Sequence, residues 1–291
     1  MEQWEEHERD IINRFFHEEV PEAFGNKFPM CFCTEQACIG YAKAIMKTDD
    51  IAPVKNQGSN SFTLRGSTTV VQFRLKSFNL DVLKLATMIY GELVPEVTEH
   101  EWFLLPTYSS KLIPGQLHLL QSFPAEFLLE REKQTVTELG AFVARTAFFE
   151  QPKTLLENNS WTKSAPGMLD LLAENPSLEI NAPELLDMVR DLQLNVDLLE
   201  TLPMVLTHHD FSQVNILVSE AGNVTGVLDV DEARIEAFGM CIWGLYEGFF
   251  GSMEDGRWSF YEEMPLLADA FWGSLWANVP SNLKQRGMEK R

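Results

Sequence analysis

In the last third of the chain, two aspartates and an asparagine are spaced so that their side chains could act together in a reaction. Asp210 precedes Asn215 by five residues, and Asp229 follows Asn215 by fourteen. Two apolar, β-branched runs follow Asp210: 214–218, which contains Asn215, and 224–228, which ends just before Asp229; an Ala-Gly-Asn turn separates them. Because antiparallel strands joined by a turn bring their outer ends together, we expect Asn215 and Asp229 to lie at the same end of a hairpin.

This arrangement suits the transfer of a phosphoryl group. Asn215 and Asp229 offer the oxygen ligands that Mg²⁺ prefers when it bridges nucleotide phosphates. Asp210, outside that pair, can orient an acceptor hydroxyl and take its proton. The same spacing can also be an ordinary turn in which a side chain caps the backbone. The two strands, the turn and Asp229 in register favour the chemical interpretation.

A glycine turn and a basic strand lie upstream. Gly58, Ser59 and Asn60 form a polar turn whose backbone amides can face an anion. The next β-branched run alternates, so Arg74 and Lys76 share one face of the predicted strand. These residues are therefore candidates for contacts with phosphate groups.

The elements that must position these residues are mixed at first and mainly helical later. Helical spacing of apolar residues occurs at 2–20, 34–47, 80–90, 129–149, 183–202, 240–250 and 258–276. Besides the hairpin, strand patterns occur at 57–64 (a turn entering a strand), 68–76, 102–105 and 205–207. We expect 151–181 to be rich in loops and a linker near 106–116 to separate the two parts.

Composition excludes several classes of partner. The chain has 43 Asp and Glu against 23 Lys and Arg, a formal charge of −20, which disfavours nucleic acid and anionic membrane surfaces. The N-terminus lacks the basic region and the following apolar region that are typical of a signal peptide. No apolar run is long enough to span a bilayer. Four cysteines are ordinary for a reducing compartment, so we expect a cytoplasmic protein. Cys31, Cys33 and Cys38 lack paired zinc-site spacing, and we interpret them as buried thiols.

A family resemblance rests on the motif residues. His208, His209, Asp210 and Asn215, followed by the Gly-Val-Leu-Asp-Val-Asp-Glu-Ala run at 226–233, resemble the aminoglycoside phosphotransferase, or choline-kinase-like, family of small-molecule kinases. That family reads roughly H-G-D-x4-N, then a hairpin, then I-D-W-E-x-A.

The resemblance extends over about residues 50–275. The turn at 58–64, the strand that ends in Arg74 and the segment 112–115 resemble the family's nucleotide loop, its basic strand and the segment after its interlobe hinge. The segment 238–245 is similar to family members from filamentous fungi. The resemblance implies an α+β, protein-kinase-like fold with a sheet-bearing N-lobe, 1–106, and a mainly helical C-lobe, 107–291.

The resemblance also implies roles for single residues. Asp210 would be the catalytic aspartate, Asn215 and Asp229 would bind Mg²⁺, and Arg74 would contact the phosphates of ATP or GTP. Lys76 is the alternative to Arg74.

The turn formed by Gly58, Ser59 and Asn60 would hold the phosphates together with Arg74. The acceptor would be the hydroxyl of a small molecule, possible products of secondary metabolism included. Candidates for its pocket are His209, Asp231 and Glu247.

Some positions depart from the family pattern and keep other functions open. His209 replaces the usual glycine, Arg74 replaces a lysine, and the helix at 80–90 offers Asp81 but no mid-helix glutamate to pair with a basic strand residue. One alternative is a pseudoenzyme that binds a nucleotide or metabolite. Another is an enzyme of natural-product biosynthesis that uses the same cleft for a different reaction. The Asp210, Asn215 and Asp229 set favours the kinase, because a scaffold has no physical need for all three.

Overall fold

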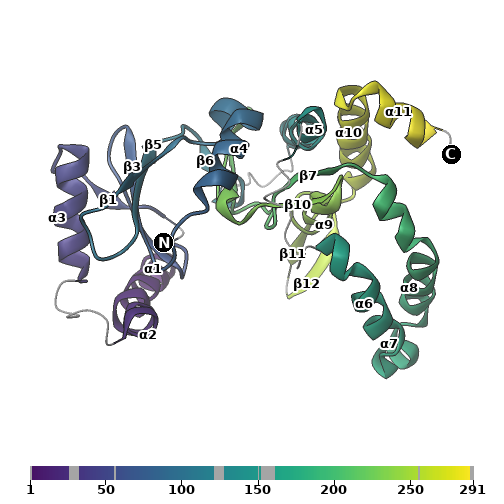
Figure 1. Ribbon diagram of the computed structural model, residues 1–291, viewed down its shortest axis with the longest axis horizontal. Helices are drawn as coiled ribbons and strands as arrows, with labels where there is room; N and C mark the ends of the chain where they lie inside the picture. The colour runs from purple at the N-terminus through teal and green to yellow at the C-terminus, as the bar shows by residue number, and fades with distance from the viewer. Residues whose placement is uncertain are drawn as a thin grey trace. The chain divides into compact units, whose positions relative to one another are not determined.

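A computed structural model describes residues 2–25, 33–55, 57–120, 128–149, 151, 161–254 and 256–288 (Figure 1). The chain forms two units: unit 1 is Met1–Thr87 with Pro95–Pro114, and unit 2 is Met88–Val94 with Gly115–Arg291. Within the described ranges, no helix is both long and apolar enough to cross a membrane.

Unit 1 is built on a five-stranded antiparallel sheet in the order β1-β2-β3-β5-β4. The strands are β1 (Ala52–Pro53), β2 (Ser61–Arg65), β3 (Thr69–Arg74), β4 (Val97–His100) and β5 (Thr107–Lys111). The β2–β3 register pairs Phe62 with Phe73 and Leu64 with Val71. All four side chains are buried, because alternate residues of a strand point to the same face of the sheet.

Helices at the N-terminus complete the core of unit 1. They are α1 (Glu2–Arg14), a π-helical turn (Phe15–Glu19), α2 (Val20–Phe24) and α3 (Glu35–Met46); a further helix, α4 (Leu80–Tyr90), lies between β3 and β4 in the chain. Phe16 packs edge-on against Phe62 of β2, with 5.1 Å between ring centroids. Thr34 caps α3 by accepting a hydrogen bond from the backbone N–H of Ala37 at 3.1 Å, as its residue type predicts.

Two of the predicted thiols lie in this core. Cys33 and Cys38 are buried, and burial raises the pKa of both. Cys31 lies outside the described residues. Among the described residues, no group of three or more His, Cys, Asp or Glu side chains is placed to hold a metal ion.

Unit 2 combines helices with short strands. Its helices are α5 (Leu129–Arg145), α6 (Trp161–Ala173), α7 (Pro176–Asn181), α8 (Pro183–Asn195), α9 (Trp243–Gly248), α10 (Met264–Asn278) and α11 (Ser281–Met288). Its strands are β6 (Gln116–Leu117), β7 (Met204–Thr207), β8 (Ile216–Val218), β9 (Val224–Val227), β10 (Arg234–Ala237), β11 (Gly251–Glu254) and β12 (Arg257–Phe260). They pair as β6-β8-β9, β7-β10 and β11-β12.

Three predicted elements were wrong. Residues 102–105 are not a strand; the neighbouring strand is β5, which pairs with β3. In the segment predicted to be rich in loops, residues 161–181 are mainly helical, since they contain α6 and α7. The helix predicted from 258 begins only at Met264, because Arg257–Phe260 pairs with Gly251–Glu254 as a hairpin.

The lobe limits drawn from the sequence differ from the two units. The sequence places the limit at 106/107, whereas unit 1 runs on to Pro114. Pairing of β5 with β3 and β4 is the physical reason, because it keeps 107–111 within the first sheet.

One helix pair dominates the packing of unit 2. Helices α5 and α10 lie in close contact, and Gly140 of α5 sits where they approach. A Cβ atom at Gly140 would lie 2.6 Å from the carbonyl oxygen of Phe271 and 3.0 Å from the backbone nitrogen of Leu275. The glycine is therefore required by the helix–helix distance.

We predict that Gly140→Ala lowers the free energy of unfolding by about 1–3 kcal/mol, the usual cost of overpacking a well-filled core. Gly273 of α10 is the matched control, since a Cβ there would meet nothing within 4 Å. Gly273→Ala should stabilise the chain by about 0.4–1 kcal/mol. Urea denaturation of the three proteins measures both effects, and equal stabilities would contradict this account of the helix contact.

Candidate functional site

A buried histidine connects the two chain segments that carry the predicted acids. His208 follows β7 and is 3% exposed. Its Nε2 lies 2.7 Å from the carbonyl oxygen of Leu228, and its Nδ1 accepts the backbone N–H of Asp210 at 3.1 Å. Since Nδ1 accepts, Nε2 must carry the proton and donate to Leu228. The imidazole is therefore neutral, and burial lowers its pKa accordingly.

Asn215 is held beside Asp210 by its own amide. Its Nδ2 donates to the backbone oxygen and to Oδ2 of Asp210, each at 2.9 Å. Asn215 is buried, whereas Asp210 is exposed. Because both bonds use Nδ2, the other amide atom, Oδ1, is the one that can serve a cation. Asp210 and Asn215 therefore lie next to each other in the structure.

Asp229 lies at the same end of the β8–β9 ladder as Asn215. The N–H of Leu228 donates to the carbonyl oxygen of Asn215 at 2.8 Å, and Asp229 is the next residue. Asp229 is exposed and has a φ of 53°, in the left-handed region that non-glycine residues seldom adopt. Such strain persists only where the surroundings hold it, and it often accompanies function. Here it turns the chain sharply after β9.

The oxygen donors of this site fit a magnesium ion. Mg²⁺ usually takes one or two protein ligands together with phosphate oxygens and water, rather than a cage of side chains. Asn215 and Asp229 offer two such ligands at one end of a hairpin. Across the residues that the structure describes, no three or more His, Cys, Asp or Glu side chains form a metal-binding group. Binding of Mg²⁺ through two protein ligands and phosphate oxygens does not require such a group.

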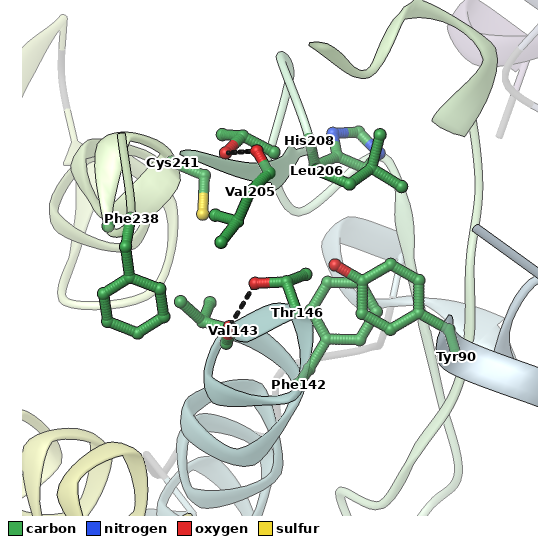
Figure 2. A pocket seen from close by; sticks show the side chains of 11 residues that line it. Tyr90, Phe142, Val143, Thr146, Val205, Leu206, His208, Phe238 and Cys241 are labelled. Carbon is green, nitrogen blue, oxygen red and sulfur yellow. Dashed lines mark hydrogen bonds between the residues drawn. The ribbon is translucent and has the colours of Figure 1, made fainter. Parts of the chain in front are cut away.

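An aromatic stack lies beneath the loop that carries Asp210. Tyr90 stacks on Phe142 with 3.9 Å between centroids, and Phe142 stacks on Phe211 at 5.7 Å. Figure 2 shows Tyr90 and Phe142 on one side of a small cavity, with His208 on the other. The cavity measures about 10 Å³, so it holds no more than a water molecule and is part of the support.

A buried charge network supports the loop from another side. His118 Nε2 lies 2.7 Å from Glu132 Oε2, and Arg131 donates to Oε1 of the same carboxylate at 2.8 and 3.0 Å. Burial opposes ionisation, but His118 and Arg131 outweigh it and hold the pKa of Glu132 below its usual value. The neighbouring Leu119 donates its N–H to the oxygen of Gln213 at 3.3 Å. The sequence gives no signal for this network, since its members share no motif.

His209, the residue in place of the family glycine, packs against the start of α6. Its ring stacks on Trp161 with 3.7 Å between centroids, and its Nε2 lies 3.4 Å from Oε1 of Glu236. Glu236 is fully buried and accepts the backbone N–H groups of Trp161 and Thr162 at 2.7 and 2.9 Å. Burial lowers the pKa of His209, and Glu236 opposes that shift. These contacts attach α6 to the Asp210 loop.

The other two pocket candidates also lie in unit 2. Asp231 is half-buried in a 3₁₀ turn, Val230–Glu232, and Glu247 is exposed on α9. The backbone oxygen of Glu247 accepts Nε1 of Trp258 at 3.2 Å.

The predicted phosphate-binding turn lies in unit 1. Gly58, Ser59 and Asn60 are all exposed between β1 and β2. The carbonyl oxygen of Asn60 accepts the N–H of Leu75, so the turn is fastened to the end of β3.

Gln57, which the sequence analysis did not single out, braces this turn. The side chain is buried and bonds three backbone groups: Nε2 donates to Val54 and Thr63 oxygens at 3.1 and 2.7 Å, and Oε1 accepts the Thr63 N–H at 2.9 Å. A glutamine before a glycine turn is too common a pattern to have revealed this role.

Arg74 and Lys76 differ in their surroundings. Arg74 ends β3, is 8% exposed, and places its guanidinium 4.1 Å above the ring of Phe78. Lys76 lies beyond the strand and is exposed. Asp81, the one acid at the start of α4, forms an exposed ion pair with Lys84 at 3.7 Å.

The fold is protein-kinase-like, with one unit built on an antiparallel sheet and a mainly helical unit that contains the hairpin described above. An ADP-bound aminoglycoside phosphotransferase, APH(2'')-Ib, superposes with a TM-score of 0.56 at 13% identity over 83% of this chain and 82% of its own. Spectinomycin phosphotransferase APH(9)-Ia with ADP and spectinomycin gives 0.52 at 13% identity over 81% and 79%. The gentamicin complex of APH(2'')-IIa gives 0.51 at 13% identity over 84% and 85%.

The sequence profile of the phosphotransferase enzyme family (APH) matches residues 116–263, just over half of the chain. The chain therefore belongs to this family, and the resemblance seen in the motif is confirmed. No match was found among curated proteins. The matched region contains all of the hairpin, His208 and the acids around it.

We predict that acid destabilises the fold through His208 and His209. Both imidazoles have a lowered pKa in the folded chain, so the unfolded chain binds protons first as the pH falls. Their contribution is complete above about pH 6.5, the ordinary histidine value, and is lost as the pH falls from there toward the lowered folded values. Urea denaturation between pH 8 and 5 should show the loss, and His208→Asn should make the curve shallower. An unchanged slope in that variant would contradict the neutral bridge.

Proposed function

We propose that this protein transfers the γ-phosphoryl group of ATP or GTP to a hydroxyl group of a small molecule. The observation that carries the proposal is the joint placement of Asp210, Asn215 and Asp229 at one end of the β8–β9 hairpin. Membership of the phosphotransferase family supports it. The kinase-like fold is consistent with it, and solved relatives of that fold were crystallised with ADP.

We assign Asp210 the role of the base. Its carboxylate is exposed, and one of its oxygens, Oδ2, is oriented by Nδ2 of Asn215 at 2.9 Å. The other oxygen can accept the hydrogen bond of an acceptor hydroxyl and align it for attack on the γ-phosphorus. As the bond from the acceptor oxygen to the γ-phosphorus forms, the bond from that phosphorus to the β–γ bridging oxygen breaks, the nucleoside diphosphate leaves, and the hydroxyl proton passes to this carboxylate.

Asn215 Oδ1 and the Asp229 carboxylate would hold Mg²⁺, which supplies neutralisation of the β- and γ-phosphate charge when bound. The turn residues Gly58 to Asn60 would offer backbone amides to the phosphates. Arg74, with its planar fork of donors, would contact the phosphates where the family has lysine, and Lys76 is its alternative.

The acceptor is proposed to be hydroxyl-bearing and uncharged or cationic, because the net charge of −20 disfavours an anion. Gentamicin and spectinomycin are bound by two proteins of similar fold, so they are rational first acceptors to test. His209, Asp231 and Glu247 remain the candidates for acceptor contacts, and a secondary metabolite remains a proposed substrate.

We expect ATP or GTP to raise the melting temperature, and we expect the full increase only when Mg²⁺ is present. At 100 times the dissociation constant, a ligand stabilises the folded state by about 2.7 kcal/mol. Asp229→Asn should lose the Mg²⁺-dependent part of the shift, because one ligand oxygen loses its charge. Asp269→Asn, an exposed acid on α10, is the control and should keep the full shift.

If neither ATP nor GTP shifts the melting temperature of the wild type, the proposed nucleotide site is wrong. If Asp229→Asn keeps the full Mg²⁺-dependent shift, then Asp229 is not a metal ligand.

We expect Asp210→Asn to lower the turnover number by about 10²- to 10⁴-fold, the usual contribution of a general base. Nucleotide binding should remain, because Asp210 is not among the proposed metal ligands. A coupled assay of nucleoside diphosphate release over a panel of hydroxyl-bearing acceptors measures the effect. Magnesium-dependent nucleotide binding without turnover of any acceptor would favour the pseudoenzyme, and unchanged turnover in the variant would remove Asp210 as the base.

A further inference from the structure

The helical hairpin of unit 2, residues 161–201, exposes an unusual amount of apolar surface. It comprises α6, α7, α8 and the 3₁₀ segment Val196–Thr201, and Figure 1 shows α6 and α8 side by side. Of its side chains, all of which are described, only Leu186 and Val189 are buried. Nine of the 20 large hydrophobic side chains exposed in the described part of the chain lie within it: Met168, Leu171, Leu172, Ile180, Leu185, Met188, Leu192, Leu194 and Leu198.

Three of these side chains form a stripe along α8. Leu185, Met188 and Leu192 are 46%, 60% and 54% exposed, and their i, i+3, i+7 spacing places them within about 60° of one another around the helix. Leu186 and Val189 occupy the adjoining strip that is buried. Packing against the rest of the hairpin therefore uses one side of α8 and leaves the stripe uncovered.

A row of acids borders the stripe on its other side. Glu184, Asp187 and Asp191 repeat the same spacing one residue earlier, so they lie next to the stripe and away from the buried strip. Arg190 pairs with Asp187 at 3.3 Å on the surface. Overall, the hairpin has eight acids against Lys163 and Arg190, a formal charge of −6.

Charge selects among the possible occupants of this surface. A second copy would bring two faces of the same negative sign together, which opposes association. A negatively charged membrane would be repelled in the same way. A helix with an apolar stripe bordered by Lys and Arg would match both the leucines and the acids.

We propose that the α8 stripe, Leu185, Met188 and Leu192, is a docking surface for a basic amphipathic helix of a partner protein. The apolar side chains supply the buried contact, and Glu184, Asp187 and Asp191 set the sign and orientation of the partner. The proposal concerns a surface apart from the Asp210 site and is independent of the proposed function.

A synthetic probe tests this surface in the full chain. An 18-residue fluorescent peptide has leucines at i, i+3, i+4 and i+7 spacing and lysines elsewhere, and its binding is followed by fluorescence anisotropy. Peptides with the leucines replaced by serine, or the lysines by glutamate, are the comparisons. We expect the Leu/Lys peptide to bind more tightly than either by at least about tenfold, equivalent to 1.4 kcal/mol.

Two triple variants locate the binding. Leu185→Ser/Met188→Ser/Leu192→Ser removes the stripe, and Glu184→Lys/Asp187→Lys/Asp191→Lys inverts its border; each should weaken binding at least about tenfold. Glu92→Lys/Glu96→Lys/Glu101→Lys changes the net charge of the chain by the same amount at exposed sites outside the hairpin, and it should keep the affinity within about twofold. Since all the substituted side chains are exposed, circular dichroism and melting should remain those of the wild type.

Four results would overturn the proposal. They are no binding by the wild type, equal binding by the hairpin variants and the wild type, equal binding of the serine and leucine peptides, and a wild-type dimer in sedimentation that the serine variant abolishes. The last result would assign the stripe to a second copy. None of them bears on phosphoryl transfer, so failure here is distinct from failure of the proposed function.

Discussion

The buried imidazole of His208 is the constraint on which the candidate site depends. It donates to Leu228 at the end of β9 and accepts from the backbone of Asp210 at the start of the loop, so one ring spans both chain segments. A neutral imidazole makes both hydrogen bonds without burying a charge. In a protonated imidazole, Nδ1 also carries a proton, so it could no longer accept the N–H of Asp210. The pairing of Asn215 with Leu228 then fixes the distance between the metal-ligand candidates.

In unit 2, the side chains that support the candidate site differ from those proposed to react. The supporting groups are buried: His208, Asn215, Phe211 and the His118–Glu132 pair all lie at or below 4% exposed. The two carboxylates that would meet substrate and metal, Asp210 and Asp229, are exposed. A preorganised site requires buried side chains that fix the positions of exposed, hydrated carboxylates, because the site geometry is then held without burying an unpaired charge. The same separation explains how a chain of charge −20 places acids close together.

The parts of the fold that were predictable from sequence have strong local patterns. The hairpin around Gly222 combines β-branched runs with a turn, and α3 has helical spacing with Thr34 at its start. The two strands, β8 and β9, and the placement of Asn215 and Asp229 at one end of their ladder follow from such patterns. Sequence patterns alone also suffice for the family, because its motif lies on these local elements.

The elements that were wrongly predicted depend on distant partners or ambiguous signals. Trp102 begins an apolar run that resembles a strand, yet its side chain is 89% exposed, while the more polar Thr107–Lys111 is a strand because it pairs with β3 on one side and with β4 on the other. Asn175-Pro176 looks like a turn, but Asn175 caps a helix by accepting the N–H of Ser177. Gln57 and Glu236 act on backbone groups that fold close to them, and no spacing in the sequence reveals such contacts.

The central claim is that Asn215 and Asp229 form a nucleotide-dependent metal site next to Asp210. Electron paramagnetic resonance of Mn²⁺, used in place of Mg²⁺, tests it most directly, because the six-line signal of the free ion is lost on binding. With ADP present, we predict that the wild type removes more of this signal than ADP alone, and that Asn215→Leu and Asp229→Asn restore it to the level of ADP alone. Equal loss of signal in the wild type and both variants, or none beyond that of ADP alone in the wild type, would contradict the account.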